Sequence, residues 1–386
     1  MTRIRSIDFA RGIVMIIMAL DHTRDLMHIA SLTQSPTDLA TTTAPLFFTR
    51  WITHFCAPVF VFLAGTSAFL SFKNKNDVIA SRQFLLSRGI WLVVLEFTLV
   101  NFGMFFDIHF SVFIFEVIAA IGVGFIVLSF LLKTPIGLVA TIGIGIIFCH
   151  NAFSFIPFEN GSVIKSILSP LLVPGAFSIS STTTFVIAYP PLPWLGIMLA
   201  GFATGKLFLL SHAKRKKICF QLGLIGLSFF IIIRFINIYG DPAPWSVQKT
   251  ALFTILSFLN VTKYPPSLQF CLLTLSAMFV VISVAEGLKN KLNDFVIVYG
   301  KVPMFYFLVH FYLLHLIMFA MVYLQGFHSS QMVFGFNFGR PKEGSGVNLP
   351  AIYLIWLCVV IVLYPLCKWY GNYKASHKEK QWLRYL

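Results

Sequence analysis

Charged residues are scarce in this chain of 386 residues. They form only 11% of it, and just 14 residues are Asp or Glu, whereas hydrophobic residues reach 58%. The mean hydropathy is +0.83. A soluble domain carries roughly 25% charged residues, so this composition has too few polar side chains to cover a water-exposed surface. The class of soluble globular proteins is excluded, and lipid is the expected solvent for most of the surface.

Paired cysteines are also missing. The chain has six cysteines, and none of them forms a CxxC or another paired spacing. This absence argues against a disulfide framework and against a cysteine zinc site. We expect the cysteines to act as small apolar residues inside membrane spans.

What the chain does contain is a series of long, continuous apolar runs. Such runs predict helices, because barrel strands in lipid would show short alternating segments. One helix needs about 20 residues to cross the hydrocarbon core. We therefore predict an all-α fold, a polytopic transmembrane helix bundle with a single domain over residues 1–386. About ten spans are expected, at 6–27, 52–72, 84–105, 110–132, 135–156, 191–210, 218–237, 266–285, 303–325 and 350–367.

Basic residues collect on one side of this predicted bundle. The formal net charge is +15, and the run from Lys214 to Lys217 falls on the same side as the basic C-terminal tail. Because Lys and Arg accumulate on cytoplasmic loops, we predict that both termini are cytoplasmic. This distribution accounts for the net charge, so nucleic acid is not an expected partner.

The outer end of the first span is crowded with ionisable side chains. It contains Asp21, His22, Arg24 and Asp25 within two helical turns. Ionisable groups at membrane depth are costly and mark functional sites by default. A carboxylate beside a histidine orients the ring and raises its basicity, as a general base requires. We predict that Asp21, His22 and Asp25 are catalytic; the alternative is a polar helix end in contact with water.

The second predicted span begins with two further polar residues at the same depth. Arg50 and His54 are four positions apart and face the same way. His54 is therefore a second candidate base, and Arg24 and Arg50 are candidate substrate-binding residues that could hold an anion. Zinc would be another use for such histidines and carboxylates, but the spacing matches no known zinc motif. No metal is expected.

Five deeper residues complete the candidate substrate-binding set. Glu96 lies in the middle of the third span, where it should be neutral or paired across helices. Glu116 in the fourth span and Arg234 in the seventh are candidates for an ion pair. His310 lies near the midplane of the ninth span, and His315, five positions later, should point about 140° away.

Seven motifs occur together along nearly the whole chain. They are Arg5-Ser6-Ile7-Asp8 with Arg11-Gly12, Met18 with Asp21-His22, Arg50-Trp51-Ile52-Thr53-His54, Ala57-Pro58-Val59-Phe60-Val61-Phe62-Leu63-Ala64-Gly65, Tyr189-Pro190 with Pro193-Trp194-Leu195-Gly196, Lys263-Tyr264-Pro265-Pro266-Ser267, and Gly300-Lys301-Val302-Pro303 with His310 and His315. Each motif alone is weak, but the set is specific. With it, the chain resembles the bacterial branch of the heparan-α-glucosaminide N-acetyltransferase family.

This resemblance implies a membrane acyltransferase. It would take an acetyl or acyl group from cytosolic acyl-CoA, with acetyl-CoA as the donor substrate, and deliver it to a saccharide or other envelope acceptor outside the bacterial inner membrane. In the lysosomal family member the catalytic histidine precedes the helix that matches Pro58 to Gly65, and His22 and His54 occupy that neighbourhood. The expected partners are the lipid bilayer, acyl-CoA, a saccharide-type acceptor and a second copy in a homodimer.

Two other functions remain open from the residues themselves. Glu96, Glu116, Arg234 and His310 could line the path of a proton-coupled small-solute transporter. The chain could also be a non-catalytic membrane partner of an envelope assembly.

Overall fold

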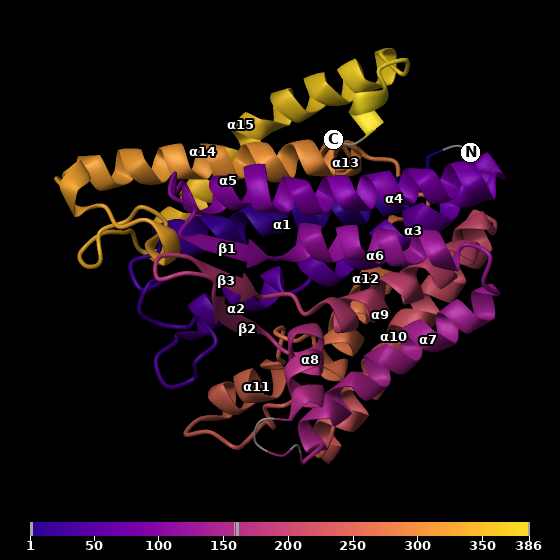
Figure 1. Cartoon of the computed structure of the whole chain (residues 1–386), viewed down its shortest axis with the longest axis horizontal. Helices are drawn as coiled ribbons and strands as arrows, with labels where there is room; N and C mark the ends of the chain where they lie inside the picture. Colours follow the sequence, from indigo (N-terminus) through magenta and orange to yellow (C-terminus); the bar gives the residue numbers. More distant parts are fainter. Residues whose placement is uncertain (1–2, 158, 160–161, 385–386) are drawn as a thin grey trace.

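The computed structural model describes residues 3–157, 159 and 162–384. It is a helical bundle in which Arg3 and Lys374, from opposite parts of the sequence, lie at one end and long loops lie at the other (Figure 1). We call the first the basic end, because it holds Arg3, Lys301 and Lys374. We call the other the loop end, because it holds the loops 28–43, 238–267 and 325–348.

The helices account for most of the described chain. They are α1 (Arg5–Met27), α2 (Ala44–Thr53), α3 (Cys56–Lys75), α4 (Val78–Leu95), α5 (Asn101–Phe105), α6 (Val117–Leu131), α7 (Ile136–Cys149), α8 (Val163–Leu172), α9 (Pro191–Thr204), α10 (His212–Ile236), α11 (Ala251–Leu259), α12 (Leu268–Ala285), α13 (Lys291–Lys301), α14 (Pro303–Leu324) and α15 (Leu349–Ser376). Glu96–Val100 is a π-helical turn that joins α4 to α5. Short 3-10 turns cover His150–Phe155, Gly205–Leu209, Ser329–Gln331, Gly335–Asn337 and Gln381–Arg384.

Eight helical segments of the described chain are long and apolar enough to cross a membrane, and each coincides with a predicted span. The other two predicted spans correspond to α1, which carries charged residues at both ends, and α6, which has 15 residues. The predicted all-α class and polytopic bundle are thus confirmed. The chain is a multi-pass membrane protein.

α1 runs through the middle of the bundle, which explains how it tolerates its charges. It packs against α2, α3, α12, α13, α14 and α15 (Figure 1). Its ionisable side chains therefore meet protein groups rather than lipid. At the basic end, Asp8 lies 3.9 Å from Arg11 and accepts a hydrogen bond of 2.5 Å from Arg3.

The predicted helix 52–72 is wrong at its beginning. α2 ends at Thr53 and α3 begins at Cys56, so His54 lies in the break between two helices. Proline has no N–H, so Pro58 cannot donate to the carbonyl of residue 54. Proline fits the first turn of a helix, where that N–H is not needed. Pro58 was therefore the signal in the sequence for a helix that starts at Cys56.

The predicted helix 110–132 is also wrong at its beginning. Val112–Phe115 forms β1, which pairs in parallel with β3 (Thr184–Ile187), and β3 pairs antiparallel with β2 (Gly175–Ser178). Branched and aromatic residues favour a strand here, but the partner strand lies about 70 residues away. Glu116 is consequently the N-cap residue of α6 rather than a residue within a helix.

Glycines allow α3 and α9 to pack backbone to backbone. A Cβ added at Gly201 would lie 2.1 Å from the carbonyl oxygen of Phe62, and one added at Gly65 would lie 2.1 Å from that of Met198. Both contacts are with backbone, so neither helix can relieve the overlap by turning a side chain. Close helix contacts of this kind rest on small residues.

We expect Gly201→Ala to destabilise the protein by about 1–3 kcal/mol or more through this overlap. The measurement is the thermal unfolding midpoint of the purified protein in detergent. Gly145→Ala in α7 is the matched control, since no atom lies within 4 Å of its added Cβ. Its midpoint should stay unchanged or rise slightly. Equal midpoints for the two variants would contradict the packing argument.

A buried carboxylate joins three helices at the basic end. Glu286, which follows α12, accepts two hydrogen bonds of 2.6 Å from Arg215 of α10, one of 2.8 Å from His212, and one from Ser6 of α1. Burial alone would raise the pKa of Glu286, but the hydrogen bonds from Arg215, Ser6 and His212 lower it below its usual value.

The pKa of Glu286 is lower in the folded protein than in the unfolded chain. Its ionised form therefore stabilises the fold at pH values above the unfolded pKa. The contribution of Glu286 should therefore be complete above about pH 4.5, the ordinary pKa of a glutamate, and be lost as the pH falls through the folded value. Glu286→Gln should lower the unfolding midpoint at pH 7 and flatten its fall below pH 4.5. Glu343→Gln, at an exposed position, is the control. Parallel pH curves for wild type and Glu286→Gln would refute this role.

Candidate functional site

Two cavities enter the bundle from opposite ends. The basic-end cavity has a volume of about 350 Å³ and is lined by Arg3 and by residues of α1, α3, α4, α6, α13, α14 and α15. The loop-end cavity has a volume of about 400 Å³ and is lined by residues of α1, α2 and the loops 28–43 and 238–267. Volumes of this size are typical of small-molecule sites.

The basic-end cavity combines cationic and apolar walls. Its five cationic lining residues are Arg3, Arg11, Arg88, Lys301 and Lys374. Its lining residues furthest toward the loop end are apolar: Met15, Val117 and Phe307. A further cavity of about 350 Å³ adjoins it and shares Arg3 and Arg11. The arrangement suits a ligand with a polyanionic head and an uncharged arm.

Most residues that line the loop-end cavity are polar, and Pro36, Ala243 and Val261 are the apolar ones. The charged groups that line it are Arg24, Asp25, Arg50 and Lys263. Its remaining lining residues include hydroxyl, amide and imidazole groups, namely Ser35, Thr37, His54, Asn260, Thr262 and Tyr264. Such groups can hydrogen-bond a hydroxylated ligand.

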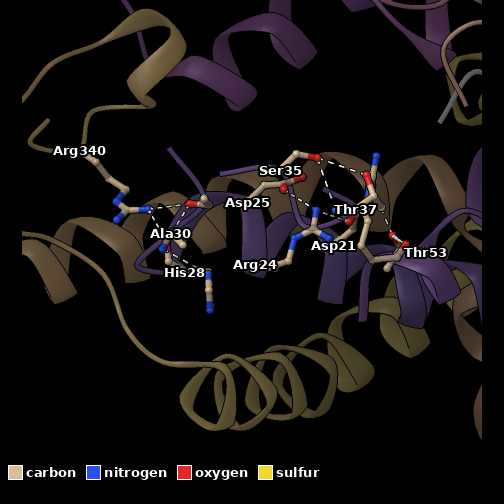
Figure 2. A network of polar contacts seen from close by, with 11 residues as sticks. Asp21, Arg24, Asp25, His28, Ala30, Ser35, Thr37, Thr53 and Arg340 are labelled. Atoms are coloured by element: carbon tan, nitrogen blue, oxygen red, sulfur yellow. Dashed lines mark hydrogen bonds and ion pairs between the residues drawn. The ribbon is translucent and has the colours of Figure 1, made fainter. Parts of the chain in front are cut away.

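The carboxylates at the end of α1 bind arginines. Asp21 lies 2.7 Å from Arg24 and 2.5 Å from Arg50, and Arg24 also reaches Asp25 at 2.5 Å (Figure 2). The prediction that Asp21 or Asp25 orients a histidine is wrong. Each carboxylate is drawn to a guanidinium, because a charge-assisted pair is stronger than a bond to a neutral imidazole.

His22 is oriented by a residue from the other half of the chain. Its Nδ1 lies 2.7 Å from Nε2 of His310 on α14. Nδ1 of His310 lies 3.1 Å from the carbonyl oxygen of Tyr306, which can only accept, so this Nδ1 carries a proton. In the neutral ring Nε2 of His310 is then an acceptor, and Nδ1 of His22 must donate to it. Nε2 of His22 is left with a free lone pair, the state a general base needs.

This histidine pair lies between the two cavities. His22 follows Met15 of the basic-end cavity by seven residues, or about 10 Å of helix. It precedes Arg24 of the loop-end cavity by two residues. His310 follows Phe307 by three residues. Among the described residues, Nε2 of His22 has no hydrogen-bond partner. This atom is not completely buried.

The remaining histidines occupy different surroundings. His54 lines the loop-end cavity, and its Nδ1 has no hydrogen-bond partner among the described residues. His315 stacks on Phe106 with ring centroids 4.4 Å apart, away from the pair formed by His22 and His310. The expectation that His310 and His315 face different groups is confirmed.

Glu96 and Glu116 do not meet Arg234. The Arg234 side chain donates hydrogen bonds to the carbonyl oxygens of Phe258, Ala243, Ser257 and Asn260. The predicted pair of Glu116 and Arg234 is therefore wrong, because carbonyls at the end of α11 already satisfy the guanidinium. Glu96 accepts a hydrogen bond of 2.7 Å from the backbone N–H of Ala119 in α6, which confirms the expected contact across helices.

Two residues at the loop end were not identified from the sequence. Lys263 belongs to a motif quoted above, but its burial could not be read from a loop sequence. Arg340 donates to the carbonyl oxygens of Leu26 and His28 at 3.3 and 3.1 Å and to the Ser31 hydroxyl at 2.9 Å (Figure 2). Arg340 thus holds the end of α1 that carries the ion pairs.

A metal centre finds no geometric support in the part of the chain that the structure describes. No three side chains from His, Cys, Asp and Glu there could hold a metal ion. The comparison with protein families matches residues 3–238 to the model described as heparan-alpha-glucosaminide N-acetyltransferase, catalytic. A comparison with curated proteins returned no match.

Proposed function

Because the chain belongs to the heparan-alpha-glucosaminide N-acetyltransferase catalytic family, we propose that it moves an acetyl group from acetyl-CoA in the basic-end cavity to an acceptor in the loop-end cavity. The observation that carries this proposal is the free Nε2 of His22, which lies between the two cavities.

The lining of the basic-end cavity supports acyl-CoA as the donor. Coenzyme A carries phosphates at one end and an uncharged pantetheine arm with the thioester at the other. Arg and Lys bind phosphates through charge-assisted hydrogen bonds. The apolar walls at Met15, Val117 and Phe307 suit the arm and bring the thioester toward His22. From the positive-inside rule we expect this end to face the cytoplasm, where acyl-CoA is found.

His22 is proposed to act as the general base. Its Nε2 takes a proton from the acceptor amine or hydroxyl as that group attacks the thioester carbonyl. The carbon–sulfur bond breaks when the tetrahedral intermediate collapses, and the departing thiolate takes up the proton. His310 is a positioning residue, since it fixes the tautomer of His22 without touching the reacting atoms. The products are the acetylated acceptor and free CoA.

The loop-end cavity supports an acceptor rich in hydroxyl groups on the far side of the membrane. Its hydroxyl, amide and guanidinium groups match the hydrogen-bonding needs of a saccharide. An envelope saccharide outside the bacterial inner membrane is therefore the proposed acceptor class.

The direct test uses protein reconstituted in liposomes with labelled acetyl-CoA and glucosamine. We expect release of the CoA thiol to match the formation of acetylated sugar, and we expect neither without the protein. Sugar uptake without consumption of acetyl-CoA would replace this proposal with a transporter. Binding to an envelope assembly without turnover would favour a non-catalytic partner.

A further inference from the structure

Glu116 carries a carboxyl group that the fold leaves without a partner. It is the N-cap residue of α6, but its side chain accepts no hydrogen bond from the first turn of that helix. The carboxyl group of Glu96 takes this place, because it accepts the hydrogen bond from the N–H of Ala119. Among the described residues, the Glu116 side chain forms no hydrogen bond and no ion pair. Ionisable groups at membrane depth are costly, so an unpaired one indicates a function.

Glu116 lies between the two cavities. The next residue, Val117, lines the basic-end cavity. The carbonyl oxygen of the preceding residue, Phe115, accepts a hydrogen bond of 3.2 Å from the N–H of Tyr189. The ring centroid of Tyr189 lies 5.8 Å from the ammonium of Lys263, a buried residue that lines the loop-end cavity. Glu116 therefore occupies the same level of the bundle as the proposed centre of the reaction.

The carboxyl group of Glu116 has open space beside it. Glu116 is half-buried, although Phe115 and Val117 on either side of it are buried. Neither of its carboxyl oxygens is completely buried. Lys263 and Asp25, which interact electrostatically with Glu116, both line the loop-end cavity. This places the carboxyl group on the side from which an acceptor enters.

The surroundings of Glu116 hold charges of both signs. Removal from water favours the neutral carboxyl group, and the negative charges of Asp25 and Asp21 act in the same direction. The cations of Lys263 and Arg50 favour the ionised form. A carboxyl group under such opposing influences can take up a proton and release it again. The other titratable groups that interact electrostatically with it are Glu96 and Tyr189.

An amine acceptor brings one proton more than His22 can take. At neutral pH an aliphatic amine is an ammonium ion, which has no lone pair and cannot attack a thioester. It must lose one proton before the attack and a second one as the carbon–nitrogen bond forms. His22 takes the second proton and passes it to the thiolate of CoA, so the first proton needs another base.

We propose that Glu116 takes this first proton from the ammonium group of an amine acceptor. This inference rests on the proposed function, because it adds a second proton acceptor to that reaction. The free amine then attacks the carbonyl carbon, the carbon–sulfur bond breaks, and the thiolate receives the proton held by His22. Glu116 finally releases its proton to solvent through the loop-end cavity. The products are the acetylated amine, free CoA and one proton, so charge and atoms balance.

The test compares Glu116→Gln with the wild type in liposomes, using glucosamine as the acceptor and thiol release as the readout. Glutamine keeps the size of the side chain but cannot take up a proton. At about pH 6, where the sugar is mostly ammonium, the variant should be about tenfold to hundredfold slower than the wild type. At about pH 9, where the amine is mostly neutral, the two rates should agree within about threefold. Taking the ratio of the rates removes the titration of His22, which both proteins share.

Glu343→Gln is the matched control, since it makes the same substitution at an exposed position that lines neither cavity. Its rate should equal that of the wild type at both pH values. An equal loss at both pH values for Glu116→Gln would show a structural role and would overturn the proposal. If that variant does not fold, Glu116→Asp and Glu116→Asn are compared instead. Only Glu116→Asn should recover as the pH rises, and identical pH profiles for the two would overturn the proposal.

The outcomes separate this inference from the proposed function. A wild-type protein that releases no thiol with any acceptor would remove the proposed function and this inference with it. Thiol release that depends on His22 but is equally sensitive to Glu116→Gln at every pH would retain the transferase and remove the proton acceptor. Transfer to hydroxyl acceptors alone would do the same, because a hydroxyl group brings only one proton.

Discussion

Replacing His22 by alanine should reduce acetyl transfer by about 10²- to 10⁴-fold, the usual contribution of a general base. The thiol released from acetyl-CoA measures this loss. The binding of acyl-CoA should change little, because His22 lies beyond the residues that line the basic-end cavity. The exposed residue His109 provides the control, since His109→Ala removes an imidazole that lines neither cavity.

The role of His310 makes the same experiment more specific. His310→Ala leaves the His22 ring in place but removes the acceptor that fixes its tautomer. The loss should be smaller than for His22→Ala, and the double variant should be no worse than His22→Ala alone, because the two residues act as one unit. Additive losses, or a His22→Ala variant with more than half of the wild-type rate, would remove His22 as the base.

Reversing one charge at the basic end should weaken the binding of acetyl-CoA specifically. Lys301 is exposed at the basic end and lines the basic-end cavity. Lys301→Glu replaces an attraction to the CoA phosphates by a repulsion, so KM for acetyl-CoA should rise by about tenfold to hundredfold with kcat little changed. Added salt should reduce the difference from the wild type, because it screens exposed charges.

A matched charge reversal controls for the general electrostatics of this end. Lys289 is also exposed at the basic end but lines neither cavity. Lys289→Glu should leave KM within about twofold of the wild-type value, since exposed charges at a distance are screened. The same rise in KM for both variants would show that net charge, rather than the cavity, attracts the donor.

The long apolar runs were enough to predict the helices, because hydrophobicity over about 20 residues depends only on local sequence. The exceptions are the segments around His54 and Val112. At His54 the helix is broken because of Pro58. Pro58 is easily placed in the middle of a helix unless its missing N–H is considered. At Val112 the determinant is β3, which lies far along the chain, and non-local pairing leaves no periodic signal in either strand.

In the candidate site, too, local sequence predicted some features, and contacts between distant segments determined the others. Proximity along α1 correctly marked Asp21 and His22 as polar residues that cluster at one end of the helix. Their partners could not be inferred, because Arg50 and His310 come from helices whose rotation the sequence does not give. Lys263 was missed for a related reason, since a lysine in a loop is normally exposed and only the fold reveals that this one is buried.

The hydrogen bonds of Arg340 to the end of α1 affect the order in which the site folds. The bonds to Leu26 and His28 span 314 and 312 residues, and the contact between His22 and His310 spans 288. During synthesis α1 emerges from the ribosome before α14 and before the loop 325–348 that carries Arg340, so the contacts of its final turn form only after those segments have been made. A chain that stops before His310 therefore lacks both the partner of His22 and the contacts of Arg340 with the end of α1.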